Sequence, residues 1–268
     1  MNKLTVYGHY RSQPSRALLW LLHMKKMPFD LVEINAPIGE AETDEYLLKF
    51  PCGTIPSIVD HGNNDLKLWD SHAIMIYLCE RHGWSEWYPS DPLGTISPSA
   101  WQELIVKRAN VNQWLHWHHD NIRHTTWRIW RPSMWKFVFN RSDVELLPLY
   151  RSGYDNLLTC LKVIKYGAFI DGATGARKGM FLAGDTPTIA DLACYCELDQ
   201  MEELGLIDLF DVPTLFPEVF EWMNRMKKVE CHDDVRVVMR RAAAQVRPDV
   251  LAVASEMLRG VKQGSGQL

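Results

Sequence analysis

The sequence YRSQPSRALLW at residues 10–20 decides the fold, because it starts a helix directly after a strand. The residues before it, KLTVY at 3–7, alternate between apolar and polar side chains, as a half-buried strand does. Pro14 suits the first turn of a helix, and the leucines after it recur at helical spacing. We therefore predict a strand at 3–7 and a helix at 14–25, joined by a turn that contains Ser12.

The segments that follow are typical of a small mixed sheet with helices on it. FDLVEI at 29–34 indicates a second strand, and residues 41–49 form a weak helix pattern. A hairpin is expected from the strands 57–60 and 65–69, which are separated by the turn sequence HGNN. A helix then runs to about Arg81. The order of strand, helix, strand, helix, hairpin and helix predicts one layered domain.

The composition changes after this helix. Residues 83–99 hold three Pro, two Gly and four Ser, which is typical of a linker between domains. Beyond them the apolar residues keep helical spacing, and no second sheet is indicated. We predict a first domain at 1–82, a linker at 83–98, an all-helical domain at 99–262 and a frayed tail at 263–268. The expected helices of the second domain are 99–131, 145–166, 188–201, 215–228 and 233–259.

The overall composition is that of a packed globular chain without a long charged run. Of 268 residues, 47% are hydrophobic and 23% are charged, and the formal net charge is -4. We therefore expect neither nucleic acid nor a membrane as a partner. The chain has no apolar stretch of about 18 residues, and its start lacks the apolar run of a secretory signal. Its six cysteines show no C-x-x-C spacing, which predicts free thiols and a cytoplasmic location.

Five segments of the chain, in order, are YRSQPSRALLW (10–20), FPCGTIPSIVD (50–60), WDSHAIMIYL (69–78), WYPSDP (87–92) and LAGDTPTIADLACYCEL (182–198). Together they resemble the glutathione transferases. The resemblance covers residues 3 to about 228, and the Ser-Gln-Pro at the first helix is most similar to the theta class. It implies an α/β thioredoxin-like N-terminal domain that binds glutathione as co-substrate, an all-α C-terminal domain, and a homodimer. Because this fold hosts several activities, the motifs indicate the fold more specifically than the reaction.

Ser12 is the residue to which the resemblance gives the catalytic role. The start of a helix offers unpaired N–H groups and a partial positive charge, and both favour an anion. A hydroxyl that donates a hydrogen bond to a thiolate lowers the thiol pKa from roughly 8.5, and each unit corresponds to about 1.4 kcal/mol. In this interpretation the glutathione thiolate is the nucleophile, and Ser12 is its hydrogen-bond donor.

Other interpretations of this turn stay open. Ser12 can act simply as the cap of the helix, a common role for Ser. Tyr7 and Tyr10 lie near the same turn, and other classes of the family use a Tyr as the donor to sulfur, although the theta-like context favours Ser12. Disulfide exchange needs a Cys at the helix start, and residues 12–15 contain none, so redox chemistry is disfavoured.

The resemblance also implies where the rest of glutathione binds. Pro56 is expected to follow a cis peptide bond, and the backbone of Ile55 to pair with the cysteinyl part. Ser71 would take the γ-glutamyl carboxylate at a helix N-terminus, and Asp70 the amino group. The full set of predicted cofactor-binding residues is Gln13, Thr54, Ile55, Pro56, Asp70 and Ser71.

At two positions the chain departs from the family pattern. Ala41 stands where theta-like relatives have a His, and Thr54 stands where they have a Lys. Both of those side chains contact the glycyl end of glutathione, and each such contact is worth about 1.5–3 kcal/mol. We therefore expect weak affinity for plain glutathione, or a thiol whose glycyl end carries another group.

Residues 111–131, VNQWLHWHHDNIRHTTWRIWR, hold four His, four Trp and three Arg. The resemblance implies that this helix lines the pocket for a small hydrophobic electrophile. His116 has the spacing to share a metal with His119 or Asp120, but the sequence specifies no third ligand, so we predict no metal site. The predicted pocket residues are Tyr10, Arg11, Trp117, Arg123 and Trp127.

The sequence TIAD at 188–191 is a capping box, which we interpret as structural. Taken together, the residues predict a glutathione transferase that conjugates the glutathione thiolate to an electrophilic small molecule. One alternative is a glutathione-dependent dehalogenase of small haloalkanes, which uses the same thiolate. Another is a non-catalytic ligand-binding protein of the same fold, which the changes at Ala41 and Thr54 favour and Ser12 opposes.

Overall fold

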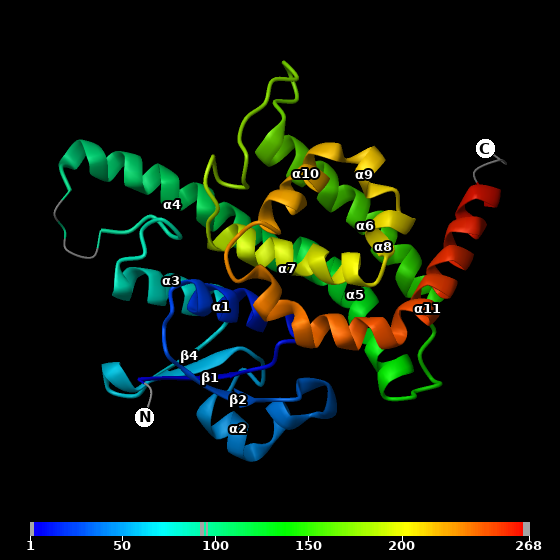
Figure 1. Ribbon diagram of the computed structural model, residues 1–268, viewed down its shortest axis with the longest axis horizontal. Helices are drawn as coiled ribbons and strands as arrows, with labels where there is room; N and C mark the ends of the chain where they lie inside the picture. Colours follow the sequence, from blue (N-terminus) through cyan, green and yellow to red (C-terminus); the bar gives the residue numbers. More distant parts are fainter. Residues whose placement is uncertain (1–2, 92–93, 95, 265–268) are drawn as a thin grey trace.

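The computed structural model describes residues 3–91, 94 and 96–264, and shows a four-stranded sheet packed on a larger set of helices (Figure 1). Strand β1 is parallel to β2 and antiparallel to β3, and β3 is antiparallel to β4, in the order β2-β1-β3-β4. The predicted fold class, an α/β thioredoxin-like domain followed by an all-α domain, is confirmed. The strands are β1 (Leu4–Gly8), β2 (Asp30–Glu33), β3 (Ser57–Asp60) and β4 (Leu66–Trp69).

The first helix, α1 (Gln13–Met24), lies between the sheet and the helical domain. Every residue from Ala17 to Leu22 is fully buried, because one face of α1 packs on α3 (Ser71–His82) and another on α7 of the second domain. A helix with apolar residues around its whole circumference is stable only when it is buried in this way. The remaining helix of the sheet domain, α2 (Asp44–Lys49), is a single short segment.

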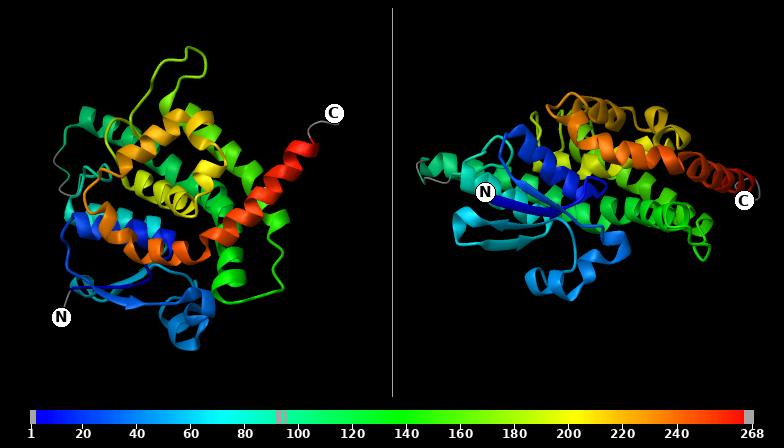
Figure 2. Two further views of the ribbon diagram at one scale, coloured as in Figure 1. Left: turned by 45° about the vertical axis from the view of Figure 1, so that its right-hand side comes forward. Right: turned by 60° about the horizontal axis from the view of Figure 1, so that its bottom comes forward.

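Helices make up most of the described second domain, which also has non-helical stretches at residues 139–146 and 170–188. The long α11 starts beside α1 and ends at the far side of the molecule from the sheet (Figures 1 and 2). Among the described residues, no helix has both the length and the apolar character that crossing a membrane requires. The helices are α4 (Pro98–His118), α5 (His124–Ser133), α6 (Leu147–Ile164), α7 (Ile189–Glu203), α8 (Leu206–Leu209), α9 (Val212–Leu215), α10 (Pro217–Met226) and α11 (His232–Gly264).

The structure corrects one of the predicted helices. The expected helix 99–131 is not one regular helix, because a π-helical turn at His119–Arg123 separates α4 from α5. Such a turn inserts a residue into the helical repeat and changes which side chains share a face. The expected helix 215–228 corresponds to α10, which begins at Pro217 and ends at Met226, after the short helix α9 that ends at Leu215. The predicted tail and linker include residues 265–268, 92, 93 and 95, which lie outside the described residues.

Helix α7 forms the centre of the second domain, with every residue from Ile189 to Met201 buried. Its first turn is the predicted capping box, in which the Asp191 carboxylate accepts hydrogen bonds from Thr188 N (2.9 Å) and Thr188 Oγ1 (3.1 Å). Asp191 also accepts from Leu182 N and from Trp222 Nε1, each at 2.9 Å. One buried carboxylate therefore satisfies donors from three separate segments.

Replacing this carboxylate should destabilise the fold. Asp191→Ala leaves four buried donors without an acceptor, and we expect the free energy of unfolding to fall by about 3 kcal/mol or more. Urea denaturation followed by circular dichroism measures this change. The control is Asp185→Ala, at an exposed position before the same helix, where we expect a change within about 0.5 kcal/mol. Equal losses for the two variants would show that Asp191 has no special structural role.

Candidate functional site

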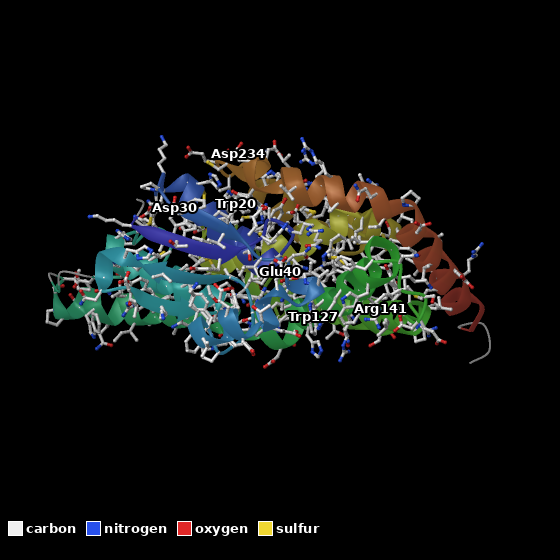
Figure 3. The ribbon with its side chains drawn as sticks, turned by 90° about the horizontal axis from the view of Figure 1, so that it is seen from below. Trp20, Asp30, Glu40, Trp127, Arg141 and Asp234 are labelled. Atoms are coloured by element: carbon white, nitrogen blue, oxygen red, sulfur yellow. The ribbon has the colours of Figure 1, made fainter. Side chains whose placement is uncertain are left out.

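A pocket of about 320 Å³ opens where the turn after β1, the loop before β3 and the helix α5 meet. Trp127 on α5 lies on the face of the molecule that Figure 3 shows, as does Glu40 in the loop after β2. The pocket is lined by His9, Arg11, Ser12, Gln13, Ile34, Asn35, Ala36, Pro37, Glu42, Gly53, Thr54, Ile55, Arg123, Trp127, Trp130, Arg131, Met134 and Trp135.

Ser12 is the N-cap of α1 and lies on the wall of this pocket. Its backbone is extended, with φ −81° and ψ 125°, and its N–H donates to the carbonyl of His9 at 2.9 Å. The Ser12 Oγ accepts from Ser15 N at 3.4 Å, a long hydrogen bond. Because the hydroxyl is the acceptor in that bond, its own hydrogen is left to donate to another group.

The turn that carries Ser12 is held by the buried guanidinium of Arg16. Arg16 Nη1 donates to the carbonyls of Tyr10 (3.1 Å) and Arg11 (3.2 Å). Arg16 Nη2 donates to Cys196 O (2.9 Å) and Gln200 Oε1 (3.1 Å), both on α7. The second domain therefore fixes the backbone immediately before Ser12.

A second polar link joins the pocket to α7. Arg123 Nη1 donates to Gln13 Oε1 at 2.8 Å and to Glu197 Oε1 at 3.2 Å. Glu197 is fully buried and also accepts a hydrogen bond from Thr126 Oγ1. Burial disfavours the charged form of Glu197, but the Arg123 charge and the contact with His118 outweigh it, so its pKa lies below the usual value.

The opposite wall of the pocket is aromatic and cationic. The Arg131 guanidinium lies between two indole rings, 4.3 Å from the ring centre of Trp127 and 4.2 Å from that of Trp135. This stacking positions a positive charge beside an apolar surface. On the other side, Arg11 N donates to His9 Nδ1 at 3.0 Å, and burial together with the Arg11 charge lowers the pKa of His9.

The peptide bond between Ile55 and Pro56 is cis, as the resemblance implied. The carbonyl of Thr54 accepts hydrogen bonds from Tyr46 OH (2.7 Å) and Ser57 Oγ (3.2 Å), which hold this loop at the edge of the pocket. The side chain of Thr54 donates to Cys52 Sγ at 3.3 Å. The loop therefore presents the backbone of these residues to the pocket, and no charged side chain.

Asp70 and Ser71 lie at the start of α3 and outside the lining of this pocket. Asp70 has a positive φ of 73°, which costs a non-glycine residue about 1–3 kcal/mol. Its Oδ1 accepts from His72 N (3.0 Å) and Ala73 N (3.1 Å), so its carboxylate caps the helix. Ser71, the next residue, is buried.

Comparison with known proteins identifies the family. The sequence profile described as "Glutathione S-transferase, N-terminal domain" matches residues 2–80, and "Glutathione S-transferase, C-terminal domain" matches residues 165–230. Glutathione S-transferase T1 of Arabidopsis thaliana is 30% identical over 235 residues, covering 85% of this chain and 84% of the relative. This chain belongs to the glutathione S-transferase family.

Further relatives place it near the theta class of these transferases. Human glutathione S-transferase theta-2 is 28% identical and is covered over 88% of its length. Glutathione S-transferase T2 of Arabidopsis thaliana is 30% identical, but the chain spans only 37% of that longer relative. Among solved structures, the apo form of human glutathione-S-transferase T1-1 superposes with a TM-score of 0.70 at 22% identity, covering 94% of this chain and 99% of that one. The glutathione complex of human theta-2 gives the same TM-score at 24% identity, covering 95% and 97% of the two chains.

The structure brings most, but not all, of the residues predicted for this transferase-like site to one pocket. Tyr10 and Trp117 do not line it: the Tyr10 hydroxyl bonds to His23 Nε2 at 3.0 Å, and the Trp117 ring packs against Trp114. Pro56, like Asp70 and Ser71, is also outside the lining. The predicted residues that do line the pocket are Arg11, Ser12, Gln13, Thr54, Ile55, Arg123 and Trp127.

Sequence reasoning missed part of the pocket wall and its supports. Arg16 belongs to the quoted SQPSRA motif, but its acceptors on α7 lie about 180 positions away, so nothing local indicated its role. The π-helical turn changes which side chains of this segment share a face, and regular helical spacing therefore did not indicate that Arg131 and Trp135 line the pocket. A charge flanked by Trp residues at helical spacing was the available signal for Arg131.

Arg123→Ala should destabilise the protein, because it leaves the buried Glu197 without its cation. We expect a loss of about 2–3 kcal/mol, somewhat less than the roughly 3–5 kcal/mol of a fully buried pair, since the Arg123 side chain is 24% exposed. Chemical denaturation measures this loss. The matched control is Arg128→Ala, on α5, whose guanidinium bonds to the Ser152 hydroxyl instead of a carboxylate. Adding Glu197→Gln to Arg123→Ala should recover stability, and a double variant no more stable than the single one would contradict this account.

Proposed function

We propose that this protein is a glutathione transferase that holds the glutathione thiolate at Ser12 and conjugates it to an electrophilic small molecule. The observation that carries the proposal is the position of Ser12. Its hydroxyl lies on the pocket wall at the N-terminus of a twelve-residue helix, with its hydrogen left to donate. A thiolate at that point would receive this hydrogen bond and the favourable field of the helix.

The charges around the pocket support an anionic ligand. Its lining includes three guanidinium groups, those of Arg11, Arg123 and Arg131, and one carboxylate, that of Glu42. Glutathione has two carboxylates and one ammonium group, and the thiolate adds a further negative charge. The amide nitrogen of Gln13 is buried and has no hydrogen-bond partner among the described residues, so a ligand beside Ser12 would satisfy it.

The glycyl end of glutathione is the part for which this chain differs most from the family pattern. Ala41 is buried and lies outside the pocket lining, and Thr54 lines it without a charge. We propose that Arg131, stacked between Trp127 and Trp135, supplies a cation to this pocket in place of the missing side chains. An Arg held in a fixed plane can bind a carboxylate with two parallel hydrogen bonds.

The apolar part of the same pocket would receive the electrophile. Trp127, Trp130, Met134 and Trp135 line it from α5 and the turn after it. Such a wall favours a flat hydrophobic molecule held against the thiolate, and positioning of this kind is a main source of rate enhancement. Displacement of a halide from a small haloalkane would use the same thiolate. We propose residues 1–82 as the glutathione-binding domain and 99–262 as the domain that supplies the electrophile pocket, while the homodimer and the cytoplasmic location stay predictions.

The test is conjugation of glutathione to a panel of aryl halides, epoxides, activated alkenes and small haloalkanes. We expect Ser12→Ala to lower kcat/KM by about 10²–10³, the usual effect of removing one donor to a developing or stabilised anion. Tyr7→Phe and Tyr10→Phe are the matched controls, because each removes only a hydroxyl near the same turn, and both should retain activity.

Two results would overturn the proposal. One is the absence of any rate above background with wild-type protein across the panel, which would favour a non-catalytic ligand-binding protein. The other is full activity in Ser12→Ala with loss in Tyr7→Phe or Tyr10→Phe, which would assign the sulfur's donor to a tyrosine. Circular dichroism of each variant checks that the fold is retained.

A further inference from the structure

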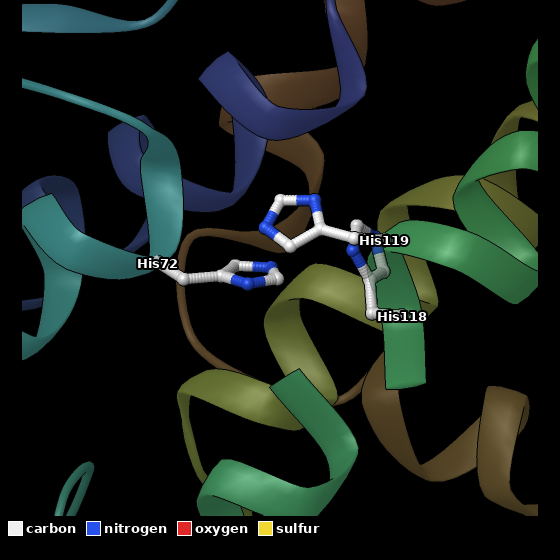
Figure 4. Close-up of side chains that lie close together, drawn as sticks. All are labelled: His72, His118 and His119. Atoms are coloured by element: carbon white, nitrogen blue, oxygen red, sulfur yellow. The ribbon is translucent and has the colours of Figure 1, made fainter. Parts of the chain in front are cut away.

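Three histidines from two distant parts of the chain converge beside the start of α3. His72 lies in the first turn of α3, and His118 and His119 lie where α4 passes into the π-helical turn. Each histidine offers one ring nitrogen that lies within 4.8 Å of a ring nitrogen of each of the other two. Figure 4 shows the His72 ring facing the rings of His118 and His119. The centre of the His72 ring lies 4.8 Å from that of His118 and 4.2 Å from that of His119.

The buried nitrogens of this cluster lack the hydrogen bonds that buried polar groups normally have. His72 is 6% exposed and His118 is 2% exposed. His72 Nε2 and both ring nitrogens of His118 have no hydrogen-bond partner among the described residues. Two nearly fully buried imidazoles that face each other with unpartnered nitrogens can both bind one ligand between them.

Carboxylates flank the cluster as they flank histidine ligands in metal proteins. His118 Nε2 lies 3.4 Å from Glu197 Oε1, and His119 Nε2 lies 3.3 Å from Asp70 Oδ2. Metal-bound histidines usually donate their second ring N–H to a carboxylate, which fixes the ring and its tautomer. With Nε2 of each residue 3.3–3.4 Å from a carboxylate oxygen, the Nδ1 of each remains for a metal ion.

We propose that His72, His118 and His119 form a binding site for a zinc-type divalent transition metal ion that joins the two domains. Three neutral imidazoles without a thiolate suit Zn²⁺, Co²⁺, Ni²⁺ or Cu²⁺ and not the oxygen-preferring Mg²⁺ or Ca²⁺. Tetrahedral zinc with Zn–N bonds of about 2.0–2.1 Å places its ligand nitrogens about 3.4 Å apart. The rings therefore move closer on binding, and His119, whose side chain is 44% exposed, has the freedom to do so.

The fourth position of the metal would face solvent. His119 is the exposed member of the cluster, and the other two are buried behind it. Water can complete a tetrahedral site from that side. This proposal differs from the sequence-based prediction of no metal site. That prediction did not consider His72, because the fold, and not the spacing in the sequence, brings His72 to His118 and His119.

The experiment is a Co²⁺ titration of the chelator-treated, reduced full-length protein, followed by its visible absorption. We expect a single Co²⁺ per chain, with a spectrum of nitrogen and oxygen ligands and without the intense near-ultraviolet band of thiolate ligation. His72→Gln and His119→Gln should each weaken binding by more than the 10–100-fold that loss of an outer-shell partner costs. His124→Gln, which removes an exposed histidine just after the π-helical turn, is the matched control and should bind like wild type.

A thermal denaturation series gives a second readout that does not depend on spectra. Zn²⁺ should raise the Tm of wild type and of His124→Gln, and should leave the Tm of His72→Gln unchanged. Because His119 is half exposed, His119→Gln retains the fold even if His72→Gln does not, and it carries the same expectation. Stoichiometric binding that persists in His119→Gln, a thiolate band, or no binding by wild type would each overturn the proposal. None of these results bears on Ser12, since no step of the test involves glutathione.

Discussion

The buried guanidinium of Arg16 is the constraint on which the arrangement of this molecule depends. A charge removed from water is tolerated only when its donors are paired and a counter-charge is close. Both terminal nitrogens of Arg16 meet this condition: Nη1 bonds to two carbonyls of the turn before Ser12 and Nη2 to two acceptors on α7, with Asp199 Oδ2 3.9 Å away. Arg16 Nε is buried without a partner among the described residues. The acceptors belong to both domains, so neither domain alone satisfies Arg16.

Asp199, the counter-ion of Arg16, also links α7 to the last helix, α11. Asp199 also pairs with Arg236 of α11 at 2.5 Å, and Arg236 Nη1 lies 3.2 Å from His232 Nε2. His232 in turn bonds to the Tyr195 hydroxyl on α7 at 2.8 Å. The polar chain thus continues from the Ser12 turn through α7 to α11. The site is therefore positioned by contacts far from it, and substitutions in this chain of residues would move Ser12 without touching it.

The local parts of this arrangement could be predicted from the sequence, and the long-range contacts could not. Pro14 and the leucines after it predicted α1 to within one residue, and the Ser-Gln-Pro context identified the turn that contains Ser12, because caps and helical spacing are local properties. The pocket wall at Arg131 and Trp135 depends on a π-helical turn, which no spacing rule indicates. The α7 partners of Arg16, and the histidines that meet His72, lie more than forty residues away in the chain, and only the packing of the second domain against the sheet domain brings them together.

The central claim is that the Ser12 turn holds glutathione as a thiolate, and the ultraviolet absorbance of the bound thiolate measures this most directly. A pH titration of the glutathione complex should give a thiol pKa at least about one unit below the roughly 8.5 of a free thiol. In Ser12→Ala the pKa of the bound thiol should return toward the free value. A bound thiol that titrates like the free one in wild type, or a lowered pKa that persists in Ser12→Ala, would contradict the account.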